Sequence, residues 1–288
     1  MRIYIFFLIS ILGSCFLNAQ NSNSEIWLFK MDSKKGTHSF AKPLNISNNP
    51  SYDNQPCFFN EDKNILFSSQ RDSTKQTDIY NFSMKENKIS RLTNTKESEY
   101  SPQLHPDNKK FTCVVVEQDS TQRIWQYNLE GKNPTLYTPK TDSIGYYAFL
   151  NSDSLIYYKL TDPHSLRVLS LSTGKDQWIG DHPSRSVRAL NSHEFYYSTA
   201  DSKKQYIRRY DSRKLKSEIV AECELENLDF NWDNEFGLLK SEGSKILRYD
   251  FERKVWIDFF DFSVFGIKKI TRFVFSKNKK YFALVDNQ

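Results

Sequence analysis

The sequence is poor in glycine and proline, and neither sign of charge dominates it. Nine residues of each type among 288 are too few for a collagen-like or linker-rich chain. The net charge is only +5, from 40 basic and 35 acidic side chains, and no dense basic stripe indicates a nucleic-acid partner. Only 38% of the residues are hydrophobic and the mean hydropathy is −0.66, which excludes a multi-span membrane protein.

Aromatic side chains are what the sequence has in quantity. They make up 15% of the chain, which is enough for a large core. Together with plentiful β-branched residues and mixed charges, they argue against disorder. No stretch after the first twenty residues sustains apolar residues at i, i+3, i+4 and i+7, so we expect no helical domain.

The N-terminus holds a short hydrophobic run. Arg2 is followed by an apolar stretch over residues 3–12. This is about the length of a secretory signal and too short to cross a bilayer, which takes roughly 20 apolar residues. We expect residues 1–19 to be a signal peptide cleaved after Ala19. The mature chain would then be periplasmic or secreted, with no transmembrane segment. The ending Asn18-Ala19-Gln20 resembles signal peptides of Bacteroidota.

A second interpretation of the same run is a lipid anchor. Leu12-Gly13-Ser14-Cys15 resembles the lipobox of bacterial lipoproteins, and it would make the protein an outer-membrane lipoprotein attached through Cys15. We prefer the soluble product because the apolar run continues through Phe16 and Leu17, beyond that cysteine.

The remaining cysteines are odd in number. Cys57, Cys113 and Cys223 have the spacing of neither a disulfide framework nor a zinc site. Each lies in an apolar or mixed stretch, so we expect small buried hydrophobic side chains. A disulfide between two of them stays open as an alternative in an oxidising compartment.

A short polar turn recurs through the rest of the chain. In each copy an aromatic residue or leucine precedes polar turn residues, and strand-forming residues follow. Asn and Asp favour such turns because their side chains bond the nearby backbone, so each copy is a predicted hairpin. The six anchor residues before the turns are 40 to 46 residues apart: Phe59, Leu104, Leu150, Leu190, Phe230 and Phe275.

After each of the first five hairpins, two further strand-forming segments follow at a similar distance from the turn. Four short strands in each such unit are the signature of a β-propeller blade. The sixth unit stops after two strands, and the mature N-terminus begins with two strands that would complete it, at 25–29 and 44–46. Joining them would remove two exposed sheet edges. We therefore predict an all-β, six-bladed propeller with four-stranded antiparallel blades and a 2+2 closure of the last blade by the two ends of the chain.

The expected domain organisation is a signal peptide followed by one propeller over residues 20–288. Its blades are predicted at about 54–93, 101–137, 145–179, 187–220, 226–257, and 268–286 joined with 25–47.

The first two units carry a recognisable motif. The first contains, in order, Asn54-Gln55-Pro56, Phe59-Asn60-Glu61-Asp62-Lys63, Thr77-Asp78-Ile79-Tyr80 and Arg91-Leu92-Thr93. This resembles the repeat of TolB-like propellers, also called PD40 or WD40-like repeats. The second unit, with Ser101-Pro102 and Pro106-Asp107, is a comparable copy, and the later units keep the period without these prolines. The resemblance implies the propeller fold and a role as a docking platform. The α/β N-terminal domain that TolB itself carries is not expected in this chain, because strand residues start five positions after Gln20.

The segments that lead into the innermost strands would line the mouth of the central pore. They mix tyrosine with arginine and acidic groups, and Tyr and Arg are enriched at protein interfaces. We predict a non-catalytic binding or docking module for an envelope protein or a cell-wall or outer-membrane component. The alternative is that this mouth is polar only because it is exposed to solvent. The predicted binding residues are Tyr52, Asp53, Asn54, Glu99, Tyr100, Tyr146, Arg185, Arg188 and Lys268.

The second functional hypothesis is a propeller enzyme, of polysaccharide lyase or hydrolase type, acting in the central funnel. His164 and His182 lie in loops one blade apart and are the candidate metal ligands. Without nearby carboxylates, two histidines are more simply solvated loop residues. No Gly-x-Ser-x-Gly, His-Glu-x-x-His or phosphate-binding glycine loop occurs in the sequence, so we assign no catalytic residue and no cofactor.

Overall fold

The computed structural model describes residues 23–34, 37–73, 75–225 and 229–287. The expected signal peptide, the alternative lipid anchor Cys15 and the segment 226–228 at the start of the fifth unit lie outside these residues. The described residues form strands, turns and loops, apart from the 3₁₀ helix η1 (Phe262–Phe265). The fold is therefore all-β, as the sequence predicted.

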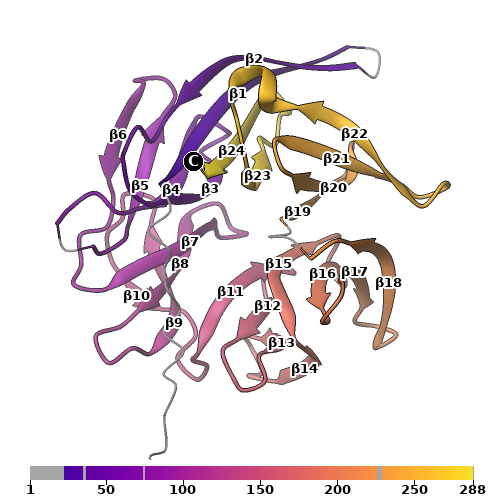
Figure 1. Ribbon diagram of the computed structural model, residues 1–288. Helices are drawn as coiled ribbons and strands as arrows, with labels where there is room; N and C mark the ends of the chain where they lie inside the picture. Colours follow the sequence, from indigo (N-terminus) through magenta and orange to yellow (C-terminus); the bar gives the residue numbers. More distant parts are fainter. Residues whose placement is uncertain (1–22, 35–36, 74, 226–228, 288) are drawn as a thin grey trace, which may run out of the picture.

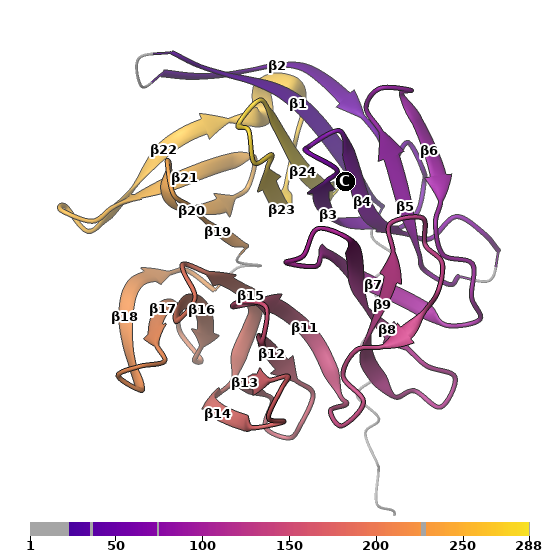
Figure 2. The same ribbon diagram turned by 180° about the vertical axis from the view of Figure 1, so that it is seen from behind.

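Six four-stranded antiparallel sheets surround a central channel (Figure 1), and Figure 2 shows the same ring from behind. In each blade one strand lies innermost and the others follow outward. This arrangement confirms the six-bladed propeller that the repeats predicted. The fifth turn anchor, Phe230, is the first residue of its strand rather than the last, because that strand, β19, runs from Phe230 to Asp233.

The strands of blades 1 to 5 follow the chain in order from the channel outward. Blade 1 consists of β3 (Asp53–Phe59), β4 (Asn64–Ser69), β5 (Asp78–Ser83) and β6 (Lys88–Arg91). Blade 2 consists of β7 (Ser98–Leu104), β8 (Lys110–Val116), β9 (Gln122–Asn128) and β10 (Thr135–Leu136). Blade 3 consists of β11 (Ile144–Phe149), β12 (Ser154–Lys159), β13 (Ser165–Ser170) and β14 (Asp176–Asp181). Blade 4 consists of β15 (Pro183–Ala189), β16 (Glu194–Ala200), β17 (Gln205–Asp211) and β18 (Lys216–Cys223). Blade 5 consists of β19 (Phe230–Asp233), β20 (Gly237–Glu242), β21 (Lys245–Asp250) and β22 (Val255–Asp261).

Blade 6 is built from both ends of the chain. From the channel outward it consists of β23 (Ile270–Phe275), β24 (Tyr281–Asn287), β1 (Ser24–Lys34) and β2 (Thr37–Asn45). In Figure 1 the indigo β1 lies beside the yellow β24. The two strands pair antiparallel from Ser24 opposite Asn287 to Lys30 opposite Tyr281. The 2+2 closure is thus confirmed.

Hydrophobic cores fill the junctions between neighbouring blades. Strand β4 shows how one blade serves two junctions. Ile65 and Phe67 belong to the core shared with blade 6, whereas Leu66 belongs to the core shared with blade 2. Successive side chains of a strand point to opposite faces, and both faces of β4 are covered. The inner strands of a blade therefore carry continuous apolar runs instead of an alternating pattern.

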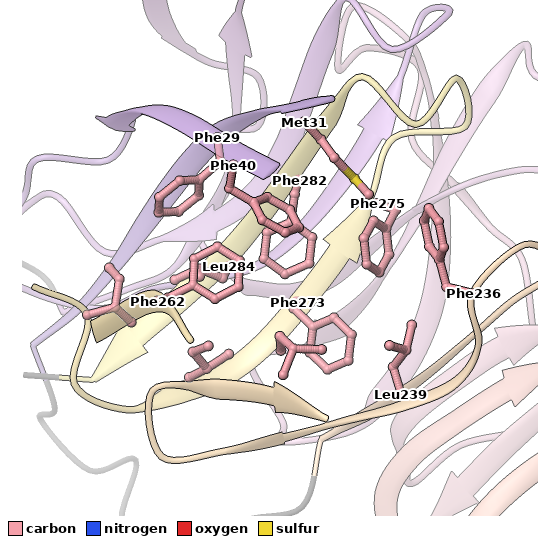
Figure 3. Packing of buried hydrophobic residues seen from close by; sticks show 13 residues of the cluster. Phe29, Met31, Phe40, Phe236, Leu239, Phe262, Phe273, Phe275, Phe282 and Leu284 are labelled. Carbon is pink, nitrogen blue, oxygen red and sulfur yellow. The ribbon is translucent and has the colours of Figure 1, made fainter. Parts of the chain in front are cut away.

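The junction of blades 5 and 6 is rich in phenylalanine (Figure 3). The fully buried Phe29 of β1 packs with its ring centroid 5.0 Å from that of Phe262 in η1, at an interplanar angle of 67°. The β1–β2 hairpin continues beyond Lys30, and its Met31 and Phe40 pack into the same core as Phe236 of blade 5. The hairpin is longer than the two short strands predicted from the sequence, and it joins blade 6 to blade 5.

A repeated hydroxyl contact holds the third strands of three blades. Ser47, Thr93 and Thr138 come after the outermost strands of blades 6, 1 and 2. Their hydroxyl oxygens accept backbone N–H groups of buried third-strand isoleucines, at 2.8 to 3.1 Å: Ile26, Ile79 and Ile124, in that order. A buried donor without a partner would cost free energy, which explains why the motif Arg91-Leu92-Thr93 ends in a hydroxyl residue.

The three described cysteines are free thiols. Cys113 and Cys223 are buried and Cys57 is half-buried. All three contact inter-blade cores, as small hydrophobic side chains would.

Phe29→Ala tests whether ring closure carries the stability of the whole chain. Truncating a buried phenylalanine costs about 3–5 kcal/mol, a large part of a typical total of about 5–15 kcal/mol. We expect the variant to melt several degrees lower, or to unfold, in thermal and urea denaturation. The control is Lys30→Ala at the adjacent exposed position, which should melt like the parent. Equal melting of both variants would show that β1 does not contribute to the cooperative fold.

Candidate functional site

Residues of all six inner strands line a cavity of about 380 Å³ in the middle of the ring. Each blade contributes side chains because its innermost strand faces the channel. Six of the lining residues carry amide or guanidinium side chains and come from five different blades: Gln55, Gln103, Arg185, Arg188, Asn231 and Arg272. The cavity therefore joins parts of the sequence that lie more than 200 residues apart.

Two of the three lining arginines come from β15. The guanidinium of Arg185 donates to the carbonyl oxygen of Thr271 in blade 6 at 2.7 Å. Arg188 donates from Nε to Oδ1 of Asn231 at 3.2 Å. Burial lowers the pKa of both guanidinium groups, and the positive charge of Arg272 lowers each pKa further. Arginine nevertheless stays protonated in proteins. The lowered pKa values therefore indicate that positive charges lie close together in a partly desolvated site.

Arg272 of β23 is the third arginine. Its Nε is buried and has no hydrogen-bond partner among the described residues. Its guanidinium carbon lies 5.5 Å from the centre of the Tyr146 ring, within the range of a cation–π contact. The Tyr146 ring thus partly stabilises the positive charge of Arg272, whose Nε has no acceptor among the described residues.

Tyrosines surround the same end of the cavity. The rings of Tyr52 and Tyr100 meet edge to face, with centroids 6.2 Å apart. Burial raises the pKa of the Tyr52 hydroxyl, and the charges of Arg272 and Arg185 partly oppose that rise. The phenol therefore stays neutral at physiological pH and can donate a hydrogen bond.

Asp229 is the buried carboxylate next to this site. Its oxygens accept the hydroxyl of Ser186 at 2.9 Å and the backbone N–H of Phe273 at 3.1 Å. The guanidinium of Arg188 lies 3.6 Å from Oδ1. Asp229 thereby ties blades 4, 5 and 6 together, and its oxygens already have partners.

The predicted binding residues divide into two groups. Tyr146, Arg185 and Arg188 line the cavity, and Tyr52 and Tyr100 lie beside them. The other four lie outside the lining residues: Asp53, Asn54, Glu99 and Lys268. The structure thus gathers the tyrosines and arginines of the predicted set.

Asp53 and Glu99 are fully buried in polar contacts away from the cavity lining. Asp53 accepts the hydroxyl of Ser69 at 2.5 Å and has Arg71 at 3.3 Å. Glu99 accepts the hydroxyls of Thr95 at 2.5 Å and Thr93 at 3.3 Å. Burial raises the pKa of Asp53 to about 6 and that of Glu99 to about 8, although these hydrogen bonds oppose the rise.

Asn54 and Lys268 make local contacts. The side-chain oxygen of Asn54 accepts the N–H of Gln55 at 2.8 Å. Lys268 is exposed, and its backbone N–H donates to Asp286 at 3.0 Å.

His164 and His182 are neighbours, as the sequence allowed. The backbone N–H of His182 donates to the carbonyl oxygen of His164 at 2.9 Å, and both residues are exposed. The His164 ring lies 5.2 Å from that of Tyr158. Within the described ranges, no group of three or more His, Cys, Asp or Glu residues is placed to hold a metal ion.

Sequence reasoning missed Arg272 and Asn231. Lys268 represented blade 6 among the predicted binding residues, whereas Arg272, Phe273 and Val274 line the cavity from that blade. The available signal was the segment 270–275, in which Arg272 is a charged residue within an otherwise largely apolar strand-forming stretch.

Comparisons with known proteins identify the fold. No protein-family model and no curated protein sequence matches the chain. Among solved structures, a TolB-like protein from Agrobacterium tumefaciens superposes with a TM-score of 0.68, over 93% of this chain and 99% of its own, at 12% identity. TolB from Acinetobacter baumannii gives a TM-score of 0.51 at 14% identity, over 68% of this chain and only 47% of its own length. A gluconolactonase from Xanthomonas campestris gives a TM-score of 0.63 at 9% identity, over 94% of this chain and 99% of its own.

At these identities the similarities establish the propeller fold, which solved TolB structures share, as the motifs indicated. The matched proteins include an enzyme as well as TolB structures, so the fold does not choose between binding and catalysis. The described residues include no helix long and apolar enough to cross a membrane.

Glu99→Gln tests the buried carboxyl groups through the pH dependence of stability. The folded protein keeps the Glu99 proton up to about pH 8, whereas an unfolded chain releases it near pH 4.5. Because the native state binds more protons between these values, stability should fall as pH rises from about 5 to 8. The glutamine variant should lose much of that fall and melt higher than the parent at pH 8. Thermal melts at pH 5 to 8 measure this. The exposed Glu86→Gln is the control, and a variant with the pH profile of the parent would contradict the assignment.

Proposed function

We propose that the mature chain is a non-catalytic binding module that docks an envelope protein or a cell-wall or outer-membrane component at the mouth of its central channel. Tyr146, Arg185 and Arg272 line one cavity, and Tyr52 and Tyr100 lie beside them; this clustering carries the proposal. Tyr and Arg are the side chains that dominate binding energy at protein interfaces when they are clustered and partly desolvated.

The chemistry of the cavity lining favours binding. Its ionisable side chains are arginines, tyrosines and Cys57. Burial raises the pKa of the Cys57 thiol and that of Tyr147, so these groups keep one protonation state near neutral pH. General acid–base catalysis works best with a group that titrates near the working pH. The groups in this lining are instead suited to holding a ligand by hydrogen bonds and charge.

The second candidate is a propeller enzyme of lyase or hydrolase type. Two observations favour it: the gluconolactonase shares the fold over 94% of this chain, and His164 lies next to His182. In that case the exposed histidines would contribute metal ligands, and a substrate would enter the funnel.

We further propose that the protein is exported. The N-terminal apolar run with its Ala19 cleavage site supports a periplasmic or secreted mature chain that starts at Gln20. Anchoring to the outer membrane through Cys15 is the alternative.

Export has a direct test in the mass of the protein recovered from the envelope or the medium. We expect the mass of residues 20–288, because signal peptidase would cut after Ala19. Intact-mass spectrometry measures it. A diacylglyceryl adduct on Cys15 would replace the soluble product by the lipoprotein, and an intact Met1 would contradict export.

Docking is tested with tagged residues 20–288 and the variants Tyr146→Ala and Arg185→Ala. If the channel mouth holds the partner, each truncation should weaken its retention from envelope extracts by about tenfold or more, as expected of interface hot spots. The control is Trp178→Ala, whose side chain is 53% exposed on the outer strand β14, and it should retain the partner. Quantitative mass spectrometry of the bound fraction measures retention.

Unchanged retention in both mouth variants would contradict docking at the channel. If the purified protein also contained stoichiometric metal that is lost when His164 and His182 are replaced, the enzyme hypothesis would be favoured instead.

A further inference from the structure

We infer that the central cavity binds the carboxylate of a small or chain-terminal acid whose body is apolar. This inference rests on the proposed binding function and names the chemistry of the ligand at the same site. Its elements are the charge of the cavity, the shape of its donors and the apolar residues at its far end.

The charge of the cavity is positive. Three guanidinium groups line it: those of Arg185, Arg188 and Arg272. Among the described residues, one carboxylate lies within 4.0 Å of these guanidinium groups. It is that of Asp229, 3.6 Å from the guanidinium of Arg188. Its oxygens already accept bonds from Ser186 and Phe273. Electrostatic attraction in this partly desolvated space therefore favours an anion.

Arg272 has free capacity to bind that anion. Its buried Nε lacks a partner among the described residues, and the Tyr146 ring covers one face of the guanidinium. Arginine offers a planar fork of N–H donors that matches the two oxygens of a carboxylate. The nearby neutral phenol of Tyr52 can donate a further hydrogen bond.

Apolar side chains lie toward the opposite end of the cavity. Leu104, Phe149 and Ala189 line it and are the last residues of β7, β11 and β15. Arg185 and Arg272 are the third residues of β15 and β23. Blades repeat by rotation about the channel axis, so their inner strands run in the same direction along the channel. Arg185 and Arg272 therefore lie toward one end and these apolar side chains toward the other, where Arg188, next to Ala189 in β15, is hydrogen-bonded to Asn231 and paired with Asp229.

This polarity selects an amphiphilic acid over a free inorganic anion. A carboxylate at the arginines would place its attached body against Leu104 and Phe149. The volume of about 380 Å³ is at the small end of ligand pockets, which span roughly 300–1,000 Å³. It suits a single aromatic or aliphatic group with its carboxylate. Such a group can come from a free organic acid or from the C-terminal residue of a protein chain.

The primary test is titration calorimetry of the mature chain with N-acetyl-phenylalanine and with its primary amide. The two probes share one apolar body, and only the acid carries the charge. We expect one saturable site for the acid and at least tenfold weaker binding of the amide, because hydrogen bonds to charged groups contribute most to binding. Equal binding of the two probes, or no binding of the acid at millimolar concentration, would overturn the inference.

The same titration with variants locates the site. Arg272→Gln and Arg185→Gln should each weaken acid binding about tenfold or more. The matched control is Arg253→Gln, in which the lost side chain is 77% exposed on an outer turn, and it should bind like the parent. A melting curve for each variant verifies folding. Unchanged binding in both cavity variants would overturn the inference, and the comparison of acid with amide on the unmodified chain holds even if one variant fails to fold.

Two further probes identify the source of the carboxylate. A pentapeptide ending in phenylalanine is compared with the same peptide carrying a C-terminal amide. Binding of the free-carboxylate peptide at least as tight as that of N-acetyl-phenylalanine supports a chain terminus as the ligand. Binding of the small acid alone supports a free organic acid. Inorganic phosphate binding as tightly as either acid would overturn the requirement for an apolar body.

The outcomes separate this inference from the proposed docking function. If the partner is lost in the Tyr146→Ala and Arg185→Ala variants but no acid binds, docking at the channel stands and the carboxylate assignment fails. If the acids bind as expected but partner retention is unchanged in those variants, the cavity is a ligand site and the docking function fails.

Discussion

The pairing of β1 with β24 is the interaction on which the rest of the structure depends. Each blade buries both faces of its sheet, so it needs a neighbour on either side. In a row of six blades the two terminal sheets would each leave one face and one set of inter-blade contacts exposed. Joining the N-terminal strands to the C-terminal pair brings blade 6 against both blade 5 and blade 1. The long β1–β2 hairpin reinforces this by packing Met31 and Phe40 on blade 5.

Closure also fixes the channel. Side chains from separate blades can meet at one cavity only if all six inner strands are held at constant distances from the axis. Hydrogen bonds across blade boundaries hold the inner strands in place at several points along the channel. Gln55 accepts the N–H of Ser101 at 2.6 Å, Arg185 reaches Thr271 at 2.7 Å, and Asp62 accepts the N–H groups of the turn at 277–278 at 2.8 to 3.0 Å. The binding residues are thus positioned by backbone groups of neighbouring blades, and such positioning limits the ordering that a ligand would have to impose.

The fold could be predicted from the sequence because its signals are local and repeated. The Asn- and Asp-containing turns, the apolar strands and the motif ending in Thr93 each have a physical cause within a few residues. The site could be predicted only in part, because side-chain direction on the inner strands is not local. Register shifts occur in β3 between Asn54 and Cys57, and in β23 between Ile270 and Arg272. A bulge adds a residue to one strand and changes which side chains face each way. This explains how Asp53 became a predicted channel residue although it is buried elsewhere, and how Arg272 was missed although it lines the cavity.

The arginines of the channel are not explained by the stability of the ring. At the position of Arg272 in its strand, other blades carry smaller or uncharged residues that also close the channel, such as Gln55 and Ser101. Burying a guanidinium without full hydrogen bonding costs free energy, and the mutual repulsion of Arg185, Arg188 and Arg272 adds to that cost. Apart from Asp229, which is paired with Arg188, the buried acids Asp53 and Glu99 lie outside the cavity lining, with hydroxyl donors at Glu99 and with Ser69 and Arg71 at Asp53. A sequence that departs from local consistency at one place commonly does so at a functional site. The excess of arginines over carboxylates at the channel therefore points to the cavity, and to an anionic group within it, as the place where this propeller acts.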